Sequence, residues 1–105
     1  MTVGKIYYSS WGYEQTNIDF YKVIEVSKTG KTITLQRIGS QIIDVNGYDS
    51  YDVIPNETKV IDAPLRNRRL ITGKYGTYVN VSKRNDYQIL AFEWDGKPKT
   101  KTSYY

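Results

Sequence analysis

A chain of 105 residues is long enough for one domain with one modest hydrophobic core. It has no cysteine and no histidine, which excludes disulfides, thiolate or imidazole metal sites and every Ser-His-Asp triad. The net charge of +4 is uneven, because residues 1–63 hold 6 Lys/Arg and 8 Asp/Glu whereas residues 64–105 hold 9 and 3. We therefore expect a single domain over 1–105 that is not an enzyme and needs no cofactor or metal.

The composition favours strands over helices. Val, Ile and Thr together number 29 and aromatic residues 15, whereas Ala and Leu number only 2 and 4. Side chains that are β-branched or aromatic suit a pleated, half-buried surface, and good helix formers are scarce here. No apolar run approaches the ~20 residues of a membrane-spanning helix, and the first residues lack a signal peptide. The sequence therefore predicts a cytoplasmic protein with no membrane partner.

The first half of the chain predicts three strands. Residues 5–9 form the first, and a polar loop over 10–17 leads to the clearest one, 18–27. On that strand one face is apolar, while the other carries Asp19, Tyr21, Glu25 and Ser27, of which Asp19 and Glu25 are expected to point to water. Residues 28–31 form a tight turn, in which Gly30 is free to take a positive φ, and 32–38 returns as a hairpin partner.

The second half predicts further short strands separated by turns. Asn46-Gly47 is a strong hairpin signal between 41–45 and 48–54, and Pro55 is expected to end the second of these. Extended segments follow at 58–62, 65–72 and 77–82. Residues 87–94 fit either a strand or a short helix, and 99–105 form a final strand. Asp95-Gly96 before it suits a two-residue hairpin turn.

This pattern predicts an all-β fold: a small antiparallel, strongly bent sheet, closed or nearly closed into a barrel of SH3-like or similar type. At most one short helix is expected, near residues 85–93. The inward-facing positions of the strands predict a core formed by Ile6, Phe20, Ile24, Val26, Ile33, Leu35, Val79 and Val81.

Two motifs near the ends of the chain carry a resemblance. Residues 9–21 read SSWGYEQTNIDFY, and residues 94–98 read WDGKP, followed by Ser103-Tyr104. They resemble the SSWGYxQTNxDFYxV start and the WDGKP…SY end of a family of short phage, prophage and plasmid proteins without an established activity. The resemblance implies a mobile-element setting, and it carries over no catalytic residue.

The first motif has two interpretations from its residues alone. Its polar side chains can bond the amides of the loop, while its aromatic residues cover a barrel end. The same mixture also suits contact with a base, a sugar or a peptide. Under the second interpretation the candidate binding residues of this motif are Trp11, Tyr13, Gln15, Asn17 and Asp19.

The second motif contributes Trp94 and Lys97 to the candidate site. Trp94 is expected to pack on the core, against Trp11 or Tyr13 across a barrel end. Because the first and last strands of a closed sheet are commonly neighbours, we expect the two motifs to form one surface.

Basic residues of the second half form a candidate nucleic-acid surface, because they are interleaved with tyrosines. Its members are Arg66, Arg68, Arg69, Lys74, Lys83 and Arg84. A solvated strand face explains the same charges. The sequence thus predicts a non-enzymatic binding module that binds nucleic acid; the alternative is a protein-interaction module that binds a host or rival protein as an inhibitor or adaptor. The oligomeric state stays open.

Overall fold

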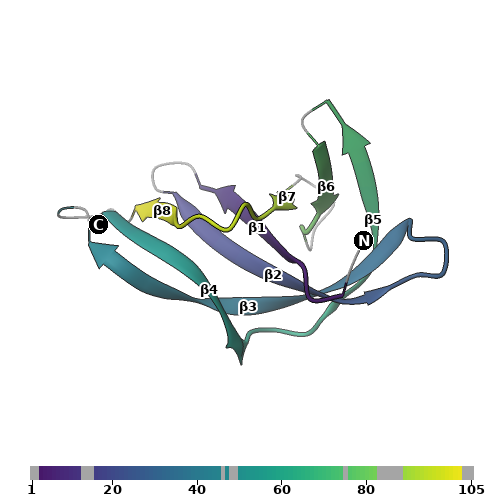
Figure 1. The fold of residues 1–105 in the computed structure, drawn as a ribbon, viewed down its shortest axis with the longest axis horizontal. Coiled ribbons are helices and arrows are strands. Elements are labelled where there is room, and N and C mark those ends of the chain that lie inside the picture. The colour runs from purple at the N-terminus through teal and green to yellow at the C-terminus, as the bar shows by residue number, and fades with distance from the viewer. Residues whose placement is uncertain are drawn as a thin grey trace.

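The computed structural model is an all-β protein built on one eight-stranded antiparallel sheet (Figure 1). It describes residues 3–12, 16–45, 47, 50–74, 76–82 and 89–102, and no helix occurs among them. Part of the segment for which a helix was considered, residues 83–88, lies outside the described residues. Residues 90–93 of the same segment form a strand.

The strand boundaries agree with the predicted turns at most places. In chain order the strands are β1 (Ile6–Trp11), β2 (Asn17–Val26), β3 (Thr32–Val45), β4 (Ser50–Val60), β5 (Leu65–Gly73), β6 (Gly76–Asn80), β7 (Leu90–Glu93) and β8 (Lys99–Thr102). The prediction that Pro55 ends its strand is wrong, since β4 continues to Val60. The register between β3 and β4 shifts just beyond Pro55, and proline is tolerated beside such an irregularity.

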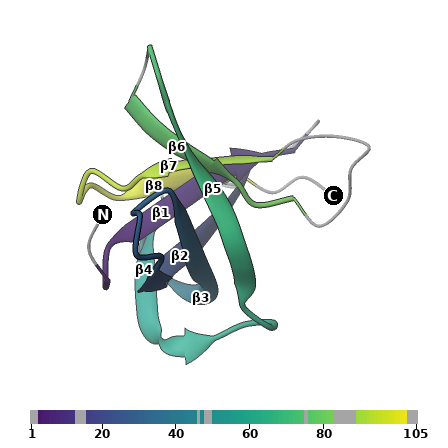
Figure 2. The same cartoon turned by 90° about the vertical axis from the view of Figure 1, so that its right-hand side faces the viewer.

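Six of the strands close into a ring. Their order is β2-β1-β7-β6-β5-β3, and β3 pairs in turn with β2. In Figure 2, β5 runs from the side of β3 up to its hairpin with β6. Each ring strand sends at least one buried side chain into a common core, which we call the inner cluster: Tyr7, Tyr21, Val23, Ile33, Leu35, Leu65, Val79, Val81 and Ala91. The prediction of an antiparallel, strongly bent sheet that is closed or nearly closed is thereby confirmed.

A second core lies on the other face of β2. The outer half of β3 pairs with β4, and β4 pairs with β8, whose Thr102 N–H donates to the carbonyl of Thr16 at 3.0 Å. These strands cover what we call the outer cluster, which is formed by Ile18, Phe20, Ile38 and Val53. Both faces of β2 are therefore buried.

Most of the predicted core residues are buried. Phe20, Ile33, Leu35, Val79 and Val81 are confirmed, and Ile6 and Val26 are half-buried.

The prediction for Ile24 is wrong, because 41% of it is exposed. The β2–β3 register skips from Val23 to Glu25, so Ile24 is an unpaired bulge residue and the alternation of faces breaks there.

The expected water-facing side of β2 is also corrected. Glu25 is exposed as predicted, but Tyr21 is only 5% exposed and the side chain of Asp19 only 16%. Strict alternation assumes that one face of a strand meets water, whereas both faces of β2 are covered by other strands. Asp19 therefore lies inside the ring rather than on its surface.

Candidate functional site

Two residues of the first motif meet at one end of the ring. Trp11 at the end of β1 and Asp19 on β2 line a cavity of about 230 Å³. Its other walls come from β2, β3, β5 and the ends of the connecting segments, through Tyr21, Arg37, Asp62, Ala63, Leu65, Val81, Ser82 and Ile89. The cavity is thus apolar on most sides, with one charged corner.

That corner is an ion-pair network centred on Arg37. Its Nη2 lies 2.9 Å from Asp19 Oδ1 and its Nη1 lies 3.1 Å from Asp62 Oδ2. The indole Nε1–H of Trp11 donates to Asp19 Oδ2 at 2.7 Å. Burial alone would lower the pKa of Arg37, but the neighbouring carboxylate of Asp19 raises it, so the guanidinium stays charged. The formal charge of this network is −1.

Asp62 is held in place by the side chain of Gln36. Gln36 Nε2 donates to the carbonyls of Ile61 at 2.9 Å and Asp62 at 3.0 Å, which fixes the turn between β4 and β5. Asp62 has a φ of 62°, an uncommon conformation for a residue other than glycine. Sequence reasoning missed Arg37 and Asp62; a polar pair, Gln36-Arg37, between the apolar positions Leu35 and Ile38 was the available signal.

The second motif is a self-contained turn. Lys97 N–H donates to Asp95 Oδ1 at 3.0 Å, and Trp94 Nε1–H donates to the Lys97 carbonyl at 2.8 Å. The Lys97 amide and the ammonium of Lys99 lower the pKa of Asp95. The ring of Trp94 packs edge-on against Phe20, with centroids 6.1 Å apart. The expected packing of Trp94 on the core is confirmed, but its place is the outer cluster.

The two motifs do not share one surface. Trp11 faces the ring-end cavity, whereas Trp94 lies on the opposite face of the sheet. The backbone N–H of Trp94 donates to the carbonyl of Ile6, at the other end of β1. The predicted hairpin at Asp95-Gly96 is also wrong, since β8 pairs with β4 and not with β7. Consequently β1 and β8 are not neighbours in the sheet.

The remaining motif residues are placed as follows. Asn17 begins β2, is half-buried and pairs with Trp11 in the β1–β2 register. Tyr13 and Gln15 lie outside the described residues. Of the candidate binding residues, the structure therefore brings together Trp11, Asn17 and Asp19, and it separates Trp94 and Lys97 from them.

Aromatic side chains form a row across the outer face of the ring. In register, Tyr78 on β6 is opposite Phe92 on β7, Phe92 is opposite Tyr8 on β1, and Tyr8 is opposite Phe20 on β2. Paired residues project on the same side of a sheet, so we call Tyr78, Phe92 and Tyr8, which are all half-buried, the aromatic row. The Tyr78 and Phe92 centroids are 5.7 Å apart. Ile71, 40% exposed, extends the row on β5.

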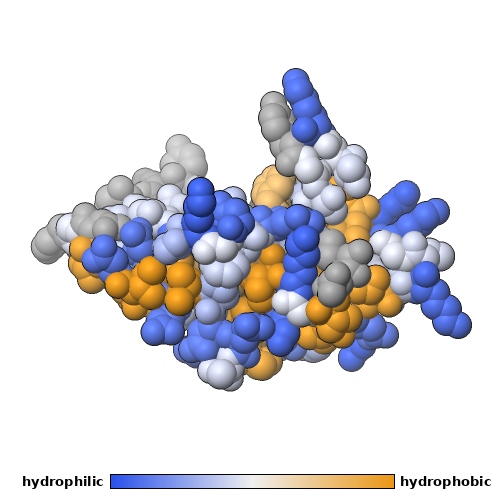
Figure 3. Space-filling model, viewed as in Figure 1, coloured by the Kyte–Doolittle hydropathy of each residue, from blue (hydrophilic) through white to orange (hydrophobic). Residues whose placement is uncertain are grey.

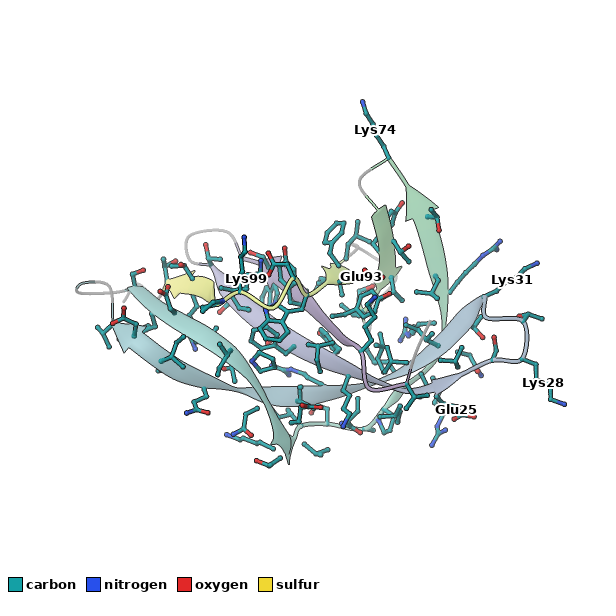
Figure 4. All side chains as sticks on the ribbon, viewed as in Figure 1. Glu25, Lys28, Lys31, Lys74, Glu93 and Lys99 are labelled. Atoms are coloured by element: carbon teal, nitrogen blue, oxygen red, sulfur yellow. The ribbon has the colours of Figure 1, made fainter. Side chains whose placement is uncertain are left out.

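Cations lie around this row. Lys99 Nζ is 4.5 Å from the centroid of the Tyr8 ring and 3.2 Å from Asp95 Oδ2. Arg69, on the same face of β5 as Ile71, is exposed. Lys74 is exposed at the tip of the β5–β6 hairpin, which rises above the body of the molecule (Figure 4).

The predicted basic surface is only partly exposed. Arg66, Arg69 and Lys74 are exposed, as expected. Arg68 is half-buried, and its Nη1 donates to the carbonyl of Ser82 at 3.2 Å, which is a structural role. Lys83 and Arg84 lie outside the described residues.

The described part of the chain contains no group of three or more Asp and Glu side chains placed to hold a metal ion. It also contains no helix long and apolar enough to cross a membrane. No protein-family model, curated protein or solved structure matches the chain.

Proposed function

We propose that this protein is a non-enzymatic module that binds single-stranded nucleic acid across the aromatic row, in the cytoplasm and in the mobile-element setting implied by its two motifs. The single observation that supports this most is the alignment of Tyr78, Phe92 and Tyr8 on three adjacent strands. Bases stack on such rings whatever their sequence, and each stacked base contributes about 1–3 kcal/mol.

The charges around the row support the same function. Arg69 and Lys74 lie on the β5–β6 hairpin beside Tyr78, and the net charge of the chain is +4. Figure 3 shows apolar atoms at the foot of this hairpin with hydrophilic atoms around them. Apolar rings between cations suit a strand whose bases turn inward and whose phosphates turn outward.

The test compares a tyrosine in the aromatic row with a tyrosine outside it. We expect Tyr78→Leu to weaken the binding of a fluorescent single-stranded oligonucleotide by about 5- to 150-fold, because it removes one stacking ring. Tyr51→Leu is the matched control, since Tyr51 is half-buried on β4 and outside the row. Fluorescence anisotropy at 50 and 200 mM salt measures the oligonucleotide affinity of the wild type and of both variants. Wild-type binding that does not weaken with salt, or equal binding by the two variants, contradicts the proposal.

A protein-interaction module is the second candidate, and the outer end of β3 favours it. Ile42, Ile43 and Val45 are 53%, 47% and 59% exposed, and Figure 3 shows apolar atoms over this end of the molecule. Exposed aliphatic clusters on small proteins commonly mark contact surfaces. This candidate is supported instead if the protein captures one host protein, if the binding persists at high salt, and if Ile43→Ser abolishes it.

A further inference from the structure

The ring has a second opening, at the end opposite the Arg37 network. There a groove of about 410 Å³ lies between the β2–β3 turn, the β5–β6 hairpin and the start of β1. Its lining is mostly polar and consists of Lys5, Gly30, Lys31, Leu70, Thr72, Thr77 and Glu93. This groove contains none of the motif residues that line the cavity at the other end.

Two hydroxyl groups form one side of the groove. Thr72 and Thr77 are opposite one another in the β5–β6 register. The pair Leu70 and Val79, two residues along, packs with the inner cluster, so by alternation both threonines also project to the inside of the ring. A threonine hydroxyl donates one hydrogen bond and can rotate to meet an acceptor.

The groove carries an uncompensated positive charge. Lys5 Nζ lies 3.2 Å from Glu93 Oε2, which leaves that pair neutral. Lys31 also lines the groove, and it has no ion-pair partner among the described residues. The neighbouring cations Lys28 and Arg69 are also without an ion pair in the described part of the chain. Figure 4 shows Lys28 and Lys31 together at this end.

The backbone places Lys31 and Arg69 on neighbouring strands, where Lys31 lines the groove inside the ring and Arg69 projects to the outer face. The carbonyl of Lys31 accepts a hydrogen bond from Leu70 N–H at 2.9 Å, and Thr32 is opposite Arg69 in the register. Because the two side chains project from opposite faces of the sheet, Lys31 is the cation without an ion pair that lines the groove. Ammonium and hydroxyl donors around an open groove therefore match an anion with several acceptor oxygens, as in phosphate.

We propose that this groove binds a phosphate group of a nucleic-acid backbone, an inference that rests on the proposed function. The groove and the aromatic row occupy successive positions of the same strands on opposite faces of the sheet: Thr77 precedes Tyr78, Thr72 follows Ile71, and Glu93 follows Phe92. A nucleic-acid strand stacked on the row turns over the rim of the ring at this end to enter the groove. Its next phosphate then meets Lys31 and the two threonine hydroxyls.

The experiment combines amide chemical shifts with salt dependence. Inorganic phosphate and, separately, a short single-stranded oligonucleotide should each shift the amide signals of Gly30, Thr72 and Thr77. Lys31→Gln should remove these shifts and should reduce the slope of log affinity against log salt by about 0.7, the value for one phosphate contact on a single strand. Lys28→Gln is the control, because it removes one positive charge from the same exposed turn and Lys28 does not line the groove. It should change neither the amide shifts nor the salt slope.

Three results overturn the proposal. The first is the absence of shifts at the groove with both ligands. The second is an equal loss in Lys31→Gln and Lys28→Gln, which would mean diffuse charge rather than a site. The third is a response to inorganic phosphate alone, which would make the groove a site for a free anion. A failure of the proposed function is distinguished from these results. If the aromatic row does not bind nucleic acid, Tyr78→Leu leaves the affinity for the oligonucleotide unchanged, while phosphate still shifts the amide signals of the groove residues.

Discussion

Arg37 is the residue on which the cavity end of the ring depends. Its two Nη atoms bond Asp19 on β2 and Asp62 in the turn before β5, two residues that are 43 positions apart in the sequence. Its Nε is buried and has no hydrogen-bond partner among the described residues. A charge in this position is tolerated because both carboxylates remain with it. The network therefore ties the turn before β5 to β2 through a single side chain.

Tyr7 makes the stability of the fold sensitive to alkaline pH. Burial raises the pKa of Tyr7 to about 12 from the usual 10.0, and the carboxylate of Glu93 adds to the shift. The unfolded chain therefore releases the proton first, and the free energy of unfolding should fall by about 2 kcal/mol as pH rises from 10 to 12. Burial and the charge of Asp19 also raise the pKa of Tyr21.

Urea denaturation at a series of pH values checks this. Tyr7→Phe should lose much of the alkaline decline, and the double variant with Tyr21→Phe should be nearly flat between pH 10 and pH 12. A decline in the double variant as steep as in the wild type would show that other groups cause it.

At the scale of the element, β2 explains where the sequence was informative. The turn before β3 was predictable because Gly30, with a φ of 72°, and a hydrogen bond from its N–H to Ser27 are local chemistry. The bulge at Ile24 was not predictable, since nothing in the neighbouring residues marks it. Its position is fixed by the pairing of β2 with β3 and by the inner cluster.

The bulge leads to a paired test with two isoleucines. Ile33→Ala should lower the free energy of unfolding by about 2–5 kcal/mol, because Ile33 is 1% exposed in the inner cluster. Ile24→Ala makes the same chemical change at the bulge and should cost less than about 1 kcal/mol, because surface substitutions have small effects. Chemical denaturation measures both. Equal losses would place Ile24 in the core and remove the bulge.

At the scale of the whole molecule, the two cores share one strand. β2 contributes Tyr21 and Val23 to the inner cluster, and Ile18 and Phe20 to the outer one. The closed sheet was predictable from its hairpins and turn residues. The outer cluster was not, because it depends on β8 joining β4 across about half of the chain. For the same reason the sequence did not reveal that Trp11 and Trp94 lie on opposite faces.

Sharing a strand predicts that the two cores unfold together. In a Trp11→Phe background the only remaining tryptophan is Trp94, so its fluorescence reports on the outer cluster. Its urea transition should coincide with that of the far-ultraviolet dichroism of the whole sheet, as for a two-state domain. A change in Trp94 emission at lower urea would mean that β4 and β8 detach before the ring opens.

The two covered faces of β2 also limit how this chain can evolve. On a strand with one face in water, every second position accepts polar substitutions, and mutations accumulate there without loss of the fold. From Ile18 to Val23, each position has a burial or pairing role: apolar side chains enter a cluster, Asp19 holds Arg37, and Lys22 pairs with Glu57 at 3.1 Å. Lineages that carry this fold should therefore retain this segment almost unchanged while the exposed end of β3 diverges.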